Sequence, residues 1–348
     1  MDTSSQRELR LVASGEPIAD LMSDLAKALV GTGPALGFGD VHSTTVTSRV
    51  AVLVATSAST GPSKEIGLSA AAVLASAKAS HNFLGARHGQ RWSLLLPLTH
   101  IAGVNILVRS LELGTFPLDL RNHKGQFPQA DFTAIVPTQL FKALNSDPNL
   151  MQHLLSAKGV LVGGAALTET LKKQAREAGI NVVTTYGSSE TSGGCVYDGR
   201  PLDGVTFKIN NDKRIRISGP VLAEDIKGDW YQSEDLGEIV DGELIVLGRA
   251  DDVIISGGEN ISLNAIESSL AKEFPTLQVA AFSVPDSLWG EALHLAVVGQ
   301  FEPSTISEFL DRSVGSFAKP KSIHTLDALP LSSIGKVDRN ALADRFTS

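Results

Sequence analysis

The sequence predicts an α/β protein in which a large N-terminal domain is followed by a small α+β domain. Three observations support this organisation. Between residues 51 and 185, short apolar runs alternate with helical stretches, which is typical of a mainly parallel sheet covered on both faces. After about residue 200 the apolar runs become short and are separated by turn residues, which indicates antiparallel strands in a small barrel or meander. At residues 248–252 the composition becomes polar, and we place the domain boundary there, giving domains 1–250 and 251–348.

The elements expected in the large domain follow from its apolar runs. Residues 18–30 predict one helix, and the glycine-rich residues 31–39 predict a loop. Buried strands are expected at residues 51–56, 92–96, 132–136, 159–162 and 182–185. Helices are expected near residues 68–86 and 101–112, after Pro137, and around 168–178. Shorter antiparallel strands are expected at residues 205–209, 214–217, 230–232, 238–240 and 243–247.

The small domain is expected to mix strands and helices. Its strands are expected around Gly257-Gly258 and near residues 278–284 and 293–299, with a helix at 262–273. A second helix is predicted to open with a capping box formed by Thr305 and Glu308. A turn at residues 330–336 and a short final helix complete the chain.

Composition excludes several classes of protein. The chain has 348 residues, of which 43% are hydrophobic, so it can bury a core and is not disordered. No apolar run reaches the roughly 18 residues of a transmembrane helix, and the polar start lacks the apolar stretch of a secretory signal. One cysteine, Cys195, excludes a disulfide framework and favours a cytoplasmic location. A net charge of −8 argues against general nucleic-acid binding.

A hydroxyl-rich loop follows the strand expected at 51–56. It contains Ser57, Ser59 and Thr60 and ends at Lys64. Hydroxyls and backbone N–H groups in such a loop can bind phosphate oxygens, and a lysine adds a positive charge. The glycine spacing does not fit the Walker pattern, so an ordinary solvated strand-to-helix loop is the alternative.

Acidic residues follow two other strands. Glu190, in the segment Tyr186–Thr191, stands where a carboxylate can hold Mg²⁺ on a nucleotide, and a tight turn with a surface glutamate is the alternative. Asp235 and Arg249 lie at strand ends, and a carboxylate that accepts two hydroxyls is a common ribose ligand. The alternative for this pair is a surface ion pair. Lys336, near the C-terminus, taken alone would be only a solvated charge.

Taken in order, these segments resemble the acyl-adenylate-forming superfamily of acyl-CoA synthetases and adenylation domains. The resemblance covers roughly residues 50–340 and rests on the phosphate loop, LPLTHIAG, GGA, YGSSE, SED, GRADD and the final GK. Within that superfamily, residues 94–103, 108–110 and 136–140 look most like o-succinylbenzoate–CoA ligases of menaquinone biosynthesis. Such enzymes have a mobile C-terminal domain, activate a carboxylic acid with ATP as acyl-AMP, and pass the acyl group to CoA. The resemblance therefore implies ATP, Mg²⁺, CoA and a small carboxylic acid as ligands, and is compatible with a homodimer.

The resemblance also assigns roles to residues. Those expected to bind ATP or AMP are Ser57, Ser59, Thr60, Lys64, Gly163, Gly164, Ala165, Tyr186, Gly187, Ser188, Thr191, Asp235 and Arg249. Gly163–Ala165 would line the adenine, and Thr191 would lie beside the α-phosphate. Glu190 would bind Mg²⁺, and Lys336 would bridge the acid carboxylate and the α-phosphate during adenylation.

Further residues are assigned to the acid and to the second step. His100, Arg109 and Ser188 are expected to bind the acid. His100 is also a catalytic candidate that can hydrogen-bond a carbonyl or gate the thiol channel, and Arg109 can bind a second carboxylate. The alternatives are a packed loop histidine and a helix-surface arginine. Rotation about a hinge at Asp251 would withdraw Lys336 and bring in Gly257, Gly258 and Glu259 for thioester formation.

Departures from the family pattern keep other functions open. Ala58 replaces a glycine of the phosphate loop, Pro62-Ser63 reverses the usual order, and Glu234 stands where glycine is common. The phosphate loop begins at residue 56, so much of the subdomain that usually precedes it is expected to be missing. The alternatives are a ligase for another acid, an adenylation enzyme that loads a carrier protein, and a degenerate domain that binds nucleotide without turnover.

Overall fold

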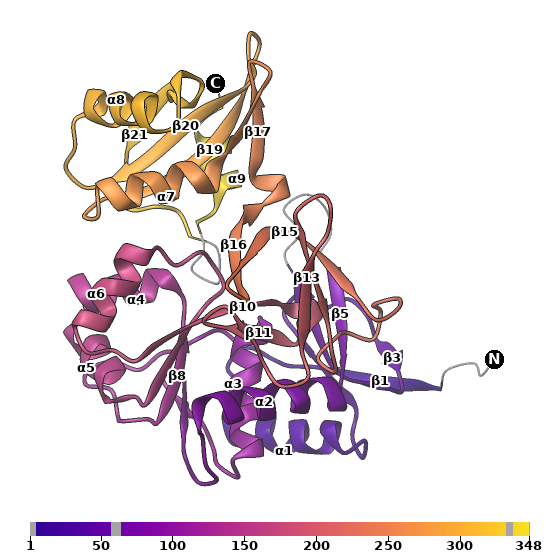
Figure 1. Ribbon diagram of the computed structural model, residues 1–348. Coiled ribbons are helices and arrows are strands. Elements are labelled where there is room, and N and C mark those ends of the chain that lie inside the picture. Colours follow the sequence, from indigo (N-terminus) through magenta and orange to yellow (C-terminus); the bar gives the residue numbers. More distant parts are fainter. Residues whose placement is uncertain (1–4, 57–63, 332–336, 348) are drawn as a thin grey trace.

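The computed structural model describes residues 5–56, 64–331 and 337–347, which form a large lobe and a smaller C-terminal lobe (Figure 1). The first sheet of the large lobe has the order β3-β1-β2-β4-β5. Its strands are β1 (Gln6–Leu11), β2 (Ala35–Phe38), β3 (Thr45–Thr47), β4 (Val50–Thr56) and β5 (Lys64–Ser69). The expected N-terminal helix is confirmed as α1 (Ile18–Leu29). The loop prediction for residues 31–39 was wrong, because β2 lies within that range and is fully buried between parallel neighbours.

The second sheet has the order β12-β11-β10-β9-β8-β6-β7. It holds the four strands predicted between residues 92 and 185 and three that were not expected, β7, β11 and β12. Its strands are β6 (Trp92–Leu94), β7 (Leu118–Asp119), β8 (Phe132–Ile135), β9 (Gly159–Val162), β10 (Val182–Ser188), β11 (Gly193–Tyr197) and β12 (Arg200–Pro201). Strands β7, β6, β8, β9 and β10 are parallel to one another. Strands β11 and β12 extend the sheet at one edge with antiparallel pairing.

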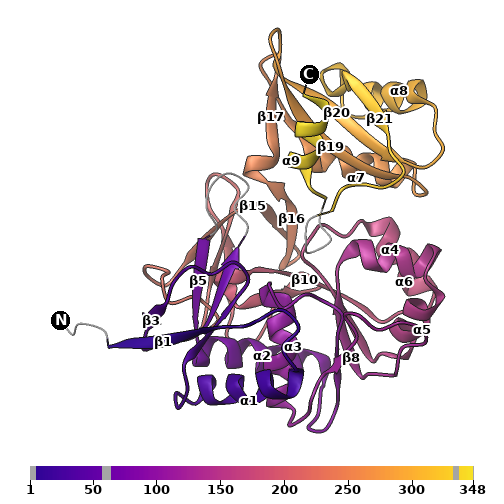
Figure 2. The same ribbon diagram turned by 180° about the vertical axis from the view of Figure 1, so that it is seen from behind.

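Helices cover both faces of this sheet. They are α2 (Ala70–Leu84), α3 (Ile101–Glu112), α4 (Pro137–Asn145), α5 (Pro148–Ser156) and α6 (Glu169–Glu177), of which only α5 was not expected. Helices α1, α2 and α3 gather on one side of the lobe, and α4, α5 and α6 lie together on the other (Figures 1 and 2). The largest buried cluster contains side chains of both sheets and of α1, α2 and α3, which therefore join the two sheets into one core. Among the described helices, none is long and apolar enough to cross a membrane.

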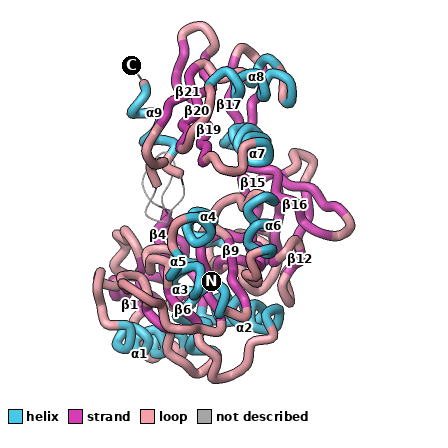
Figure 3. The backbone as a smooth tube through the Cα atoms, turned by 90° about the vertical axis from the view of Figure 1, so that its left-hand side faces the viewer, coloured by secondary structure: helices cyan, strands magenta, loops and turns pink. Residues whose placement is uncertain are grey.

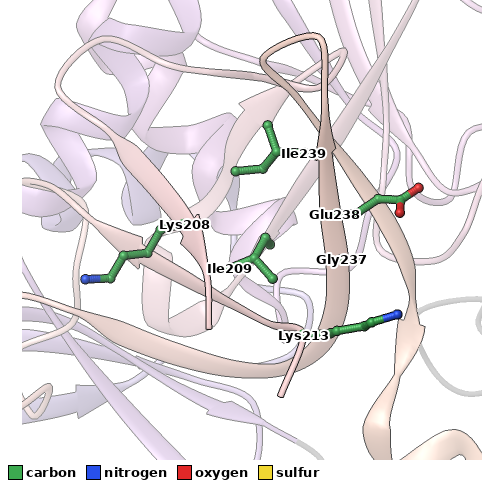
Figure 4. Close-up of a pocket in the computed structure, with 6 residues that line it drawn as sticks. All are labelled: Lys208, Ile209, Lys213, Gly237, Glu238 and Ile239. Carbon is green, nitrogen blue, oxygen red and sulfur yellow. The ribbon is translucent and has the colours of Figure 1, made fainter. Parts of the chain in front are cut away.

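The strands beyond residue 200 form an antiparallel meander. It has the order β13-β14-β15-β16, with β13 (Thr206–Ile209), β14 (Arg214–Ser218), β15 (Tyr231–Val240) and β16 (Glu243–Arg249). The two strands predicted at 230–232 and 238–240 are one strand, whose pairing with β16 shifts register between Leu236 and Gly237. An open depression at this sheet is lined in part by Ile209, Gly237 and Ile239, and none of the predicted site residues that the structure describes lines it (Figure 4).

The C-terminal lobe has its own sheet, of order β18-β17-β20-β19 with β21 beside β20. Its elements are β17 (Val253–Ser256), β18 (Glu259–Ser262), α7 (Leu263–Glu273), β19 (Gln278–Asp286), β20 (Gly290–Val298), α8 (Pro303–Ser313), β21 (Ser322–Thr325) and α9 (Arg339–Phe346). Its buried clusters contain no residue before Ile254, and the lobe lies above α4 and α6 (Figures 1 and 3). The capping box at Thr305 was wrong, since α8 begins at Pro303 with Glu302 as its N-cap.

A buried histidine of the large lobe is expected to make stability depend on pH. His153 on α5 donates from Nδ1 to the Pro128 carbonyl at 2.9 Å, so its Nε2 accepts from the Ser93 hydroxyl at 2.8 Å. The side chain is 2% exposed, and burial lowers its pKa. Below about pH 6.5 the unfolded chain therefore binds a proton that the folded chain does not, and the folded state loses stability.

We expect the free energy of unfolding to fall as the pH is lowered from about 7 to about 5.5, and to fall by about 1 kcal/mol less in His153→Gln. Urea unfolding at several pH values measures this difference. The control is His88→Gln, which replaces an exposed histidine. The same pH dependence in all three proteins would contradict the expectation.

Candidate active site

The lysine that ends the predicted phosphate loop lies close to the predicted magnesium ligand. Lys64 Nζ, at the start of β5, lies 3.3 Å from Glu190 Oε1, in the short helix η1 (Ser189–Thr191) that follows β10. The Glu190 side chain is 15% exposed and that of Lys64 is 57% exposed. Although 126 residues separate them in the sequence, a carboxylate and a cation therefore face each other at one place on the surface.

The phosphate loop connects two strands and not, as the sequence predicted, a strand to a helix. Thr56 pairs with Lys64 across the antiparallel β4–β5 pair, and the Thr56 hydroxyl donates to the Lys64 carbonyl at 3.1 Å. The predicted phosphate ligands Ser57, Ser59 and Thr60 lie outside the described residues. Their segment is nevertheless anchored at both described ends, one of which carries the lysine that faces Glu190.

The turn that holds Glu190 is closed by hydrogen bonds of its own. The Thr191 hydroxyl accepts from Ser188 N at 2.9 Å and donates to the Gly193 carbonyl at 2.8 Å. A side chain at Gly187 would lie 2.0 Å from the same Gly193 carbonyl, so this position requires glycine. The turn is thus a tightly packed support for Glu190, whose side chain stays partly exposed.

This packing corrects one sequence expectation. Thr191 is fully buried and its hydroxyl bonds within the turn, so it does not present that hydroxyl to an α-phosphate. Ser189, which sequence reasoning did not single out, is partly exposed beside Glu190. A hydroxyl directly preceding the metal-binding candidate was the signal that could have identified it.

The predicted ribose group combines Tyr186 on β10, Asp235 on β15 and Arg249 at the end of β16. The Tyr186 hydroxyl donates to Asp235 Oδ2 at 2.8 Å, and Arg249 Nη1 lies 3.5 Å from Asp235 Oδ1. Asp235 and Arg249 are paired across β15 and β16, so the register of the meander brings them together. Burial, followed by the Asp235 charge, raises the pKa of Tyr186, which keeps the phenol protonated as a donor. The Asp235 side chain is 20% exposed, so this carboxylate is held by the protein and still reaches the surface.

The glycines predicted to line adenine follow β9, the neighbour of β10. A side chain at Gly163 would lie 2.1 Å from Thr185 Oγ1, and Gly164 has a φ of +82°. Both positions therefore favour glycine, which leaves the backbone open beside the Tyr186 strand. Ala165 is exposed at the same edge. The geometry is compatible with a flat ligand lying against the backbone.

The two acid-side candidates lie at different depths of α3. His100 is the half-buried N-cap residue of α3, whereas Arg109 lies nine residues later, about 13 Å along the helix axis. Arg109 is only 3% exposed, which excludes the surface alternative. Its Nη2 donates to the Tyr197 hydroxyl at 2.9 Å, and its guanidinium carbon lies 4.9 Å from the centre of the Trp92 ring.

Arg109 is a buried cation without a counter-ion. In the part of the chain that the structure describes, no carboxylate lies within 4 Å of its guanidinium, and its Nε has no hydrogen-bond partner. Burying a charge without an opposite charge is costly, which makes this position suited to an anionic ligand. The sequence reasoning identified Arg109 but missed Trp92 and Tyr197, which hold it.

The residues assigned to the second step lie in the small lobe. Gly257 and Gly258 form the two-residue turn between β17 and β18, with φ of +59° and +87°, and Glu259 is exposed beside them. A side chain at Gly257 would lie 2.4 Å from the ring of Trp289. Among the described residues, no hydrogen bond or ion pair joins this turn to Glu190 or Lys64.

Two further predictions concern Asp251 as the hinge and Lys336 as the catalytic lysine. Asp251 lies in the short helix η2 (Ala250–Asp252) between β16 and β17. Lys336 lies outside the described residues. The described residues on either side of its segment, Leu331 and Val337, pair in an isolated antiparallel β-bridge. The domain boundary, the hinge and the role of Lys336 stay predictions.

Comparisons with known proteins agree with this geometry. Residues 8–250 match the AMP-binding enzyme family, and residues 265–336 match the C-terminal domain of AMP-binding enzymes. The chain is 36% identical to a probable 2-succinylbenzoate–CoA ligase of Mycobacterium tuberculosis, over 96% of this chain and 97% of that protein. Among solved structures, Escherichia coli MenE bound to an analogue of OSB-AMS is similar with a TM-score of 0.67 and 26% identity, over 96% of this chain and 81% of that one. The o-succinylbenzoate CoA synthetase of Bacillus subtilis in complex with ATP and a magnesium ion has the same fold, with a TM-score of 0.71 and 22% identity over 92% of this chain and 82% of that one.

Proposed function

Because the chain belongs to the AMP-binding enzyme family and is an AMP-forming acid–CoA ligase, we propose that the acid it activates is o-succinylbenzoate, for menaquinone biosynthesis in the cytoplasm. The observation that carries the proposal is Arg109, a buried cation for which the protein supplies no anion. o-Succinylbenzoate has two carboxylates. One reacts with ATP, and the other is then available to pair with Arg109.

The nucleotide is proposed to bind between Glu190 and Asp235. Asp235, which contacts Tyr186 and Arg249, is proposed to bind the ribose hydroxyls, while Lys64 and the loop hydroxyls bind the outer phosphates. Ser189 is proposed as the hydroxyl beside the α-phosphate in place of Thr191. AMP in the second step occupies the same ribose site.

Mg²⁺ fits the donors present. The Glu190 carboxylate is a hard oxygen ligand, and it already faces the Lys64 cation. Within residues 5–56, 64–331 and 337–347, no group of three or more acidic, histidine or cysteine side chains could hold a metal alone. A single carboxylate is the protein contribution expected when an ion also binds phosphates and water. Mg²⁺ supplies neutralisation of the triphosphate charge, and Glu190 positions it.

The reaction proceeds in two displacements. An oxygen of the acid carboxylate bonds to the α-phosphorus, and the bond from that phosphorus to pyrophosphate breaks, which gives acyl-AMP. The sulfur of CoA then bonds to the acyl carbon, the thiol proton passes to solvent, and AMP leaves with the electron pair of the broken C–O bond. Lys336 stabilises charge in the first step, and rotation at Asp251 brings Gly257–Glu259 towards the site for the second. His100 is proposed to contact the acyl carbonyl or the thiol.

The protein's own thiol has no part in this chemistry. Cys195 is fully buried on β11, and burial raises its pKa to about 12. The neutral thiol is unreactive as a nucleophile at neutral pH. The thiol that accepts the acyl group is therefore the one on CoA.

The test compares two acids that differ by one carboxylate. The chain is incubated with ATP, Mg²⁺, CoA and either o-succinylbenzoate or benzoylpropionate, which lacks the ring carboxylate. Pyrophosphate release reports adenylation, and mass spectrometry of CoA reports the thioester. We expect kcat/KM to be at least about 100-fold higher for o-succinylbenzoate, as the loss of a buried charge pair predicts. Equal values for the two acids overturn the proposed substrate.

Other outcomes identify the alternatives. Pyrophosphate release without a CoA thioester favours an enzyme that loads a carrier protein. No pyrophosphate release with any aromatic or aliphatic acid favours a degenerate nucleotide-binding domain. Preference for a different acid keeps the ligase activity and replaces only the substrate.

Replacing Arg109 by methionine is expected to separate acid binding from folding. Arg109→Met removes the charge but keeps most of the volume, so we expect the KM for o-succinylbenzoate to rise about 100-fold and the KM for ATP to stay unchanged. Because the free protein no longer buries an unpaired cation, its thermal stability should be equal or higher. Steady-state kinetics and thermal unfolding measure the two effects.

The matched control is Arg200→Met, which removes an arginine that is 71% exposed on β12 and pairs with Glu243. It should leave both KM values unchanged. An unchanged KM for o-succinylbenzoate in Arg109→Met would remove Arg109 from the acid site.

A further inference from the structure

We infer that Tyr197 is a positioning residue for acid specificity, because its hydroxyl holds the Arg109 guanidinium in place without neutralising it. This inference rests on the proposed function, in which Arg109 binds the second carboxylate of the acid. Tyr197 lies at the end of β11 and is fully buried, and within the described residues its hydroxyl bonds to Ser80 and Arg109 and to none of the predicted nucleotide ligands.

The direction of each hydrogen bond is fixed by chemistry. A guanidinium has only donors, so the Tyr197 oxygen must accept from Arg109 Nη2, at 2.9 Å. The phenol proton is then free to go to Ser80 Oγ, which also lies 2.9 Å away. Phe83 packs edge-on against the Tyr197 ring at 5.3 Å and limits its tilt. The hydroxyl is therefore held in one orientation from both sides.

The opposite side of Arg109 is held by an aromatic face. Trp92 Nε1 donates to His81 Nε2 at 3.0 Å, so the single proton of a neutral His81 lies on Nδ1, which donates to Glu112. Burial lowers the pKa of His81 and so favours this neutral form. Glu112, His81 and Trp92 thus form a chain of bonds that fixes the indole ring 4.9 Å from the guanidinium carbon.

Both supports orient the cation and leave its charge available. A phenol oxygen and an indole face attract a guanidinium without carrying a negative charge. A carboxylate at position 197 would instead form a permanent ion pair and compete with the carboxylate of the acid. Because Tyr197 and Trp92 are neutral and Arg109 Nε has no hydrogen-bond partner among the described residues, the guanidinium can still pair with an anionic group of the ligand.

The test is Tyr197→Phe, which keeps the ring and removes the hydroxyl. We expect the KM for o-succinylbenzoate to rise about tenfold, because a hydrogen bond to a charged group is lost. The KM values for ATP and benzoylpropionate should stay within about twofold, with kcat unchanged, since neither ligand uses Arg109. A merely structural role would instead shift the constants of both acids and of ATP together.

Two further variants make the result specific. Ser80→Ala removes the acceptor of the phenol proton but leaves the bond to Arg109, so it should change the KM for o-succinylbenzoate less than about threefold. Trp92→Phe keeps an aromatic face but loses the bond to His81, and should raise the same KM selectively. Thermal unfolding of each variant reports whether its fold is retained.

Failure of the inference is distinguishable from failure of the proposed function. If wild-type protein does not discriminate between the two acids, the proposed substrate fails and the inference fails with it. If wild type discriminates and Arg109→Met abolishes the discrimination while Tyr197→Phe preserves it, only the positioning role is overturned. Equal increases in both acid KM values for Tyr197→Phe also overturn it.

Discussion

Replacing Lys336 by alanine is expected to abolish acyl-AMP formation while sparing thioester formation from supplied acyl-adenylate. During adenylation negative charge develops between the carboxylate and the α-phosphate, and one positioned cation is worth about 10²–10³ in rate. In the second step the acyl group is already activated, and the proposed rotation of the small domain has withdrawn Lys336. The two half-reactions should therefore respond differently to one substitution.

Each half-reaction has its own measurement. Exchange of labelled pyrophosphate into ATP reports the first step, and AMP release from chemically prepared acyl-adenylate and CoA reports the second. Lys321→Ala is the control, because Lys321 lies in the same lobe and pairs with Asp286. Equal loss of both half-reactions in Lys336→Ala would contradict the assigned role.

The sequence predicted the buried frame of the large lobe well because its strands are uninterrupted apolar runs. The helix expected at 101–112 is α3, and the strand expected at 159–162 is β9. The four residues of β2 were missed because they lie among glycines, and their burial comes from neighbouring strands. The start of α8 was misplaced for a local reason, since Pro303 fits the first turn better than an interior position.

The candidate site was predictable to the extent that its residues lie at the ends of predicted strands. Glu190 lies in the short helix that directly follows β10 and Arg249 ends β16, whereas Asp235 lies inside the single strand β15, and the structure brings Asp235 and Arg249 together. The support of Arg109 could not be predicted, since Tyr197 is 88 residues away and only the packing of α3 against β11 joins them. The role of Thr191 also depends on turn geometry that its sequence neighbours do not reveal.

Replacing Glu190 by glutamine is expected to lower the rate of acyl-AMP formation about 100-fold and to raise the Mg²⁺ concentration needed for half-maximal rate. The amide keeps the size of the side chain but loses the charged oxygen that a hard cation prefers. The substitution also removes the ion pair with Lys64, whose side chain is 57% exposed, and this loss should change the free energy of unfolding little. Pyrophosphate release at a series of Mg²⁺ concentrations measures both effects.

The control and the second half-reaction decide how this loss is interpreted. Glu243→Gln removes a carboxylate that pairs with Arg200 at 3.0 Å on the meander, and it should leave the Mg²⁺ dependence unchanged. Thioester formation from supplied acyl-adenylate should survive in Glu190→Gln, because no triphosphate remains to be neutralised in that step. If the rate falls while the Mg²⁺ dependence stays the same, Glu190 supports the fold of the turn and does not hold the ion. If both half-reactions fall together, the substitution has damaged the AMP site that they share.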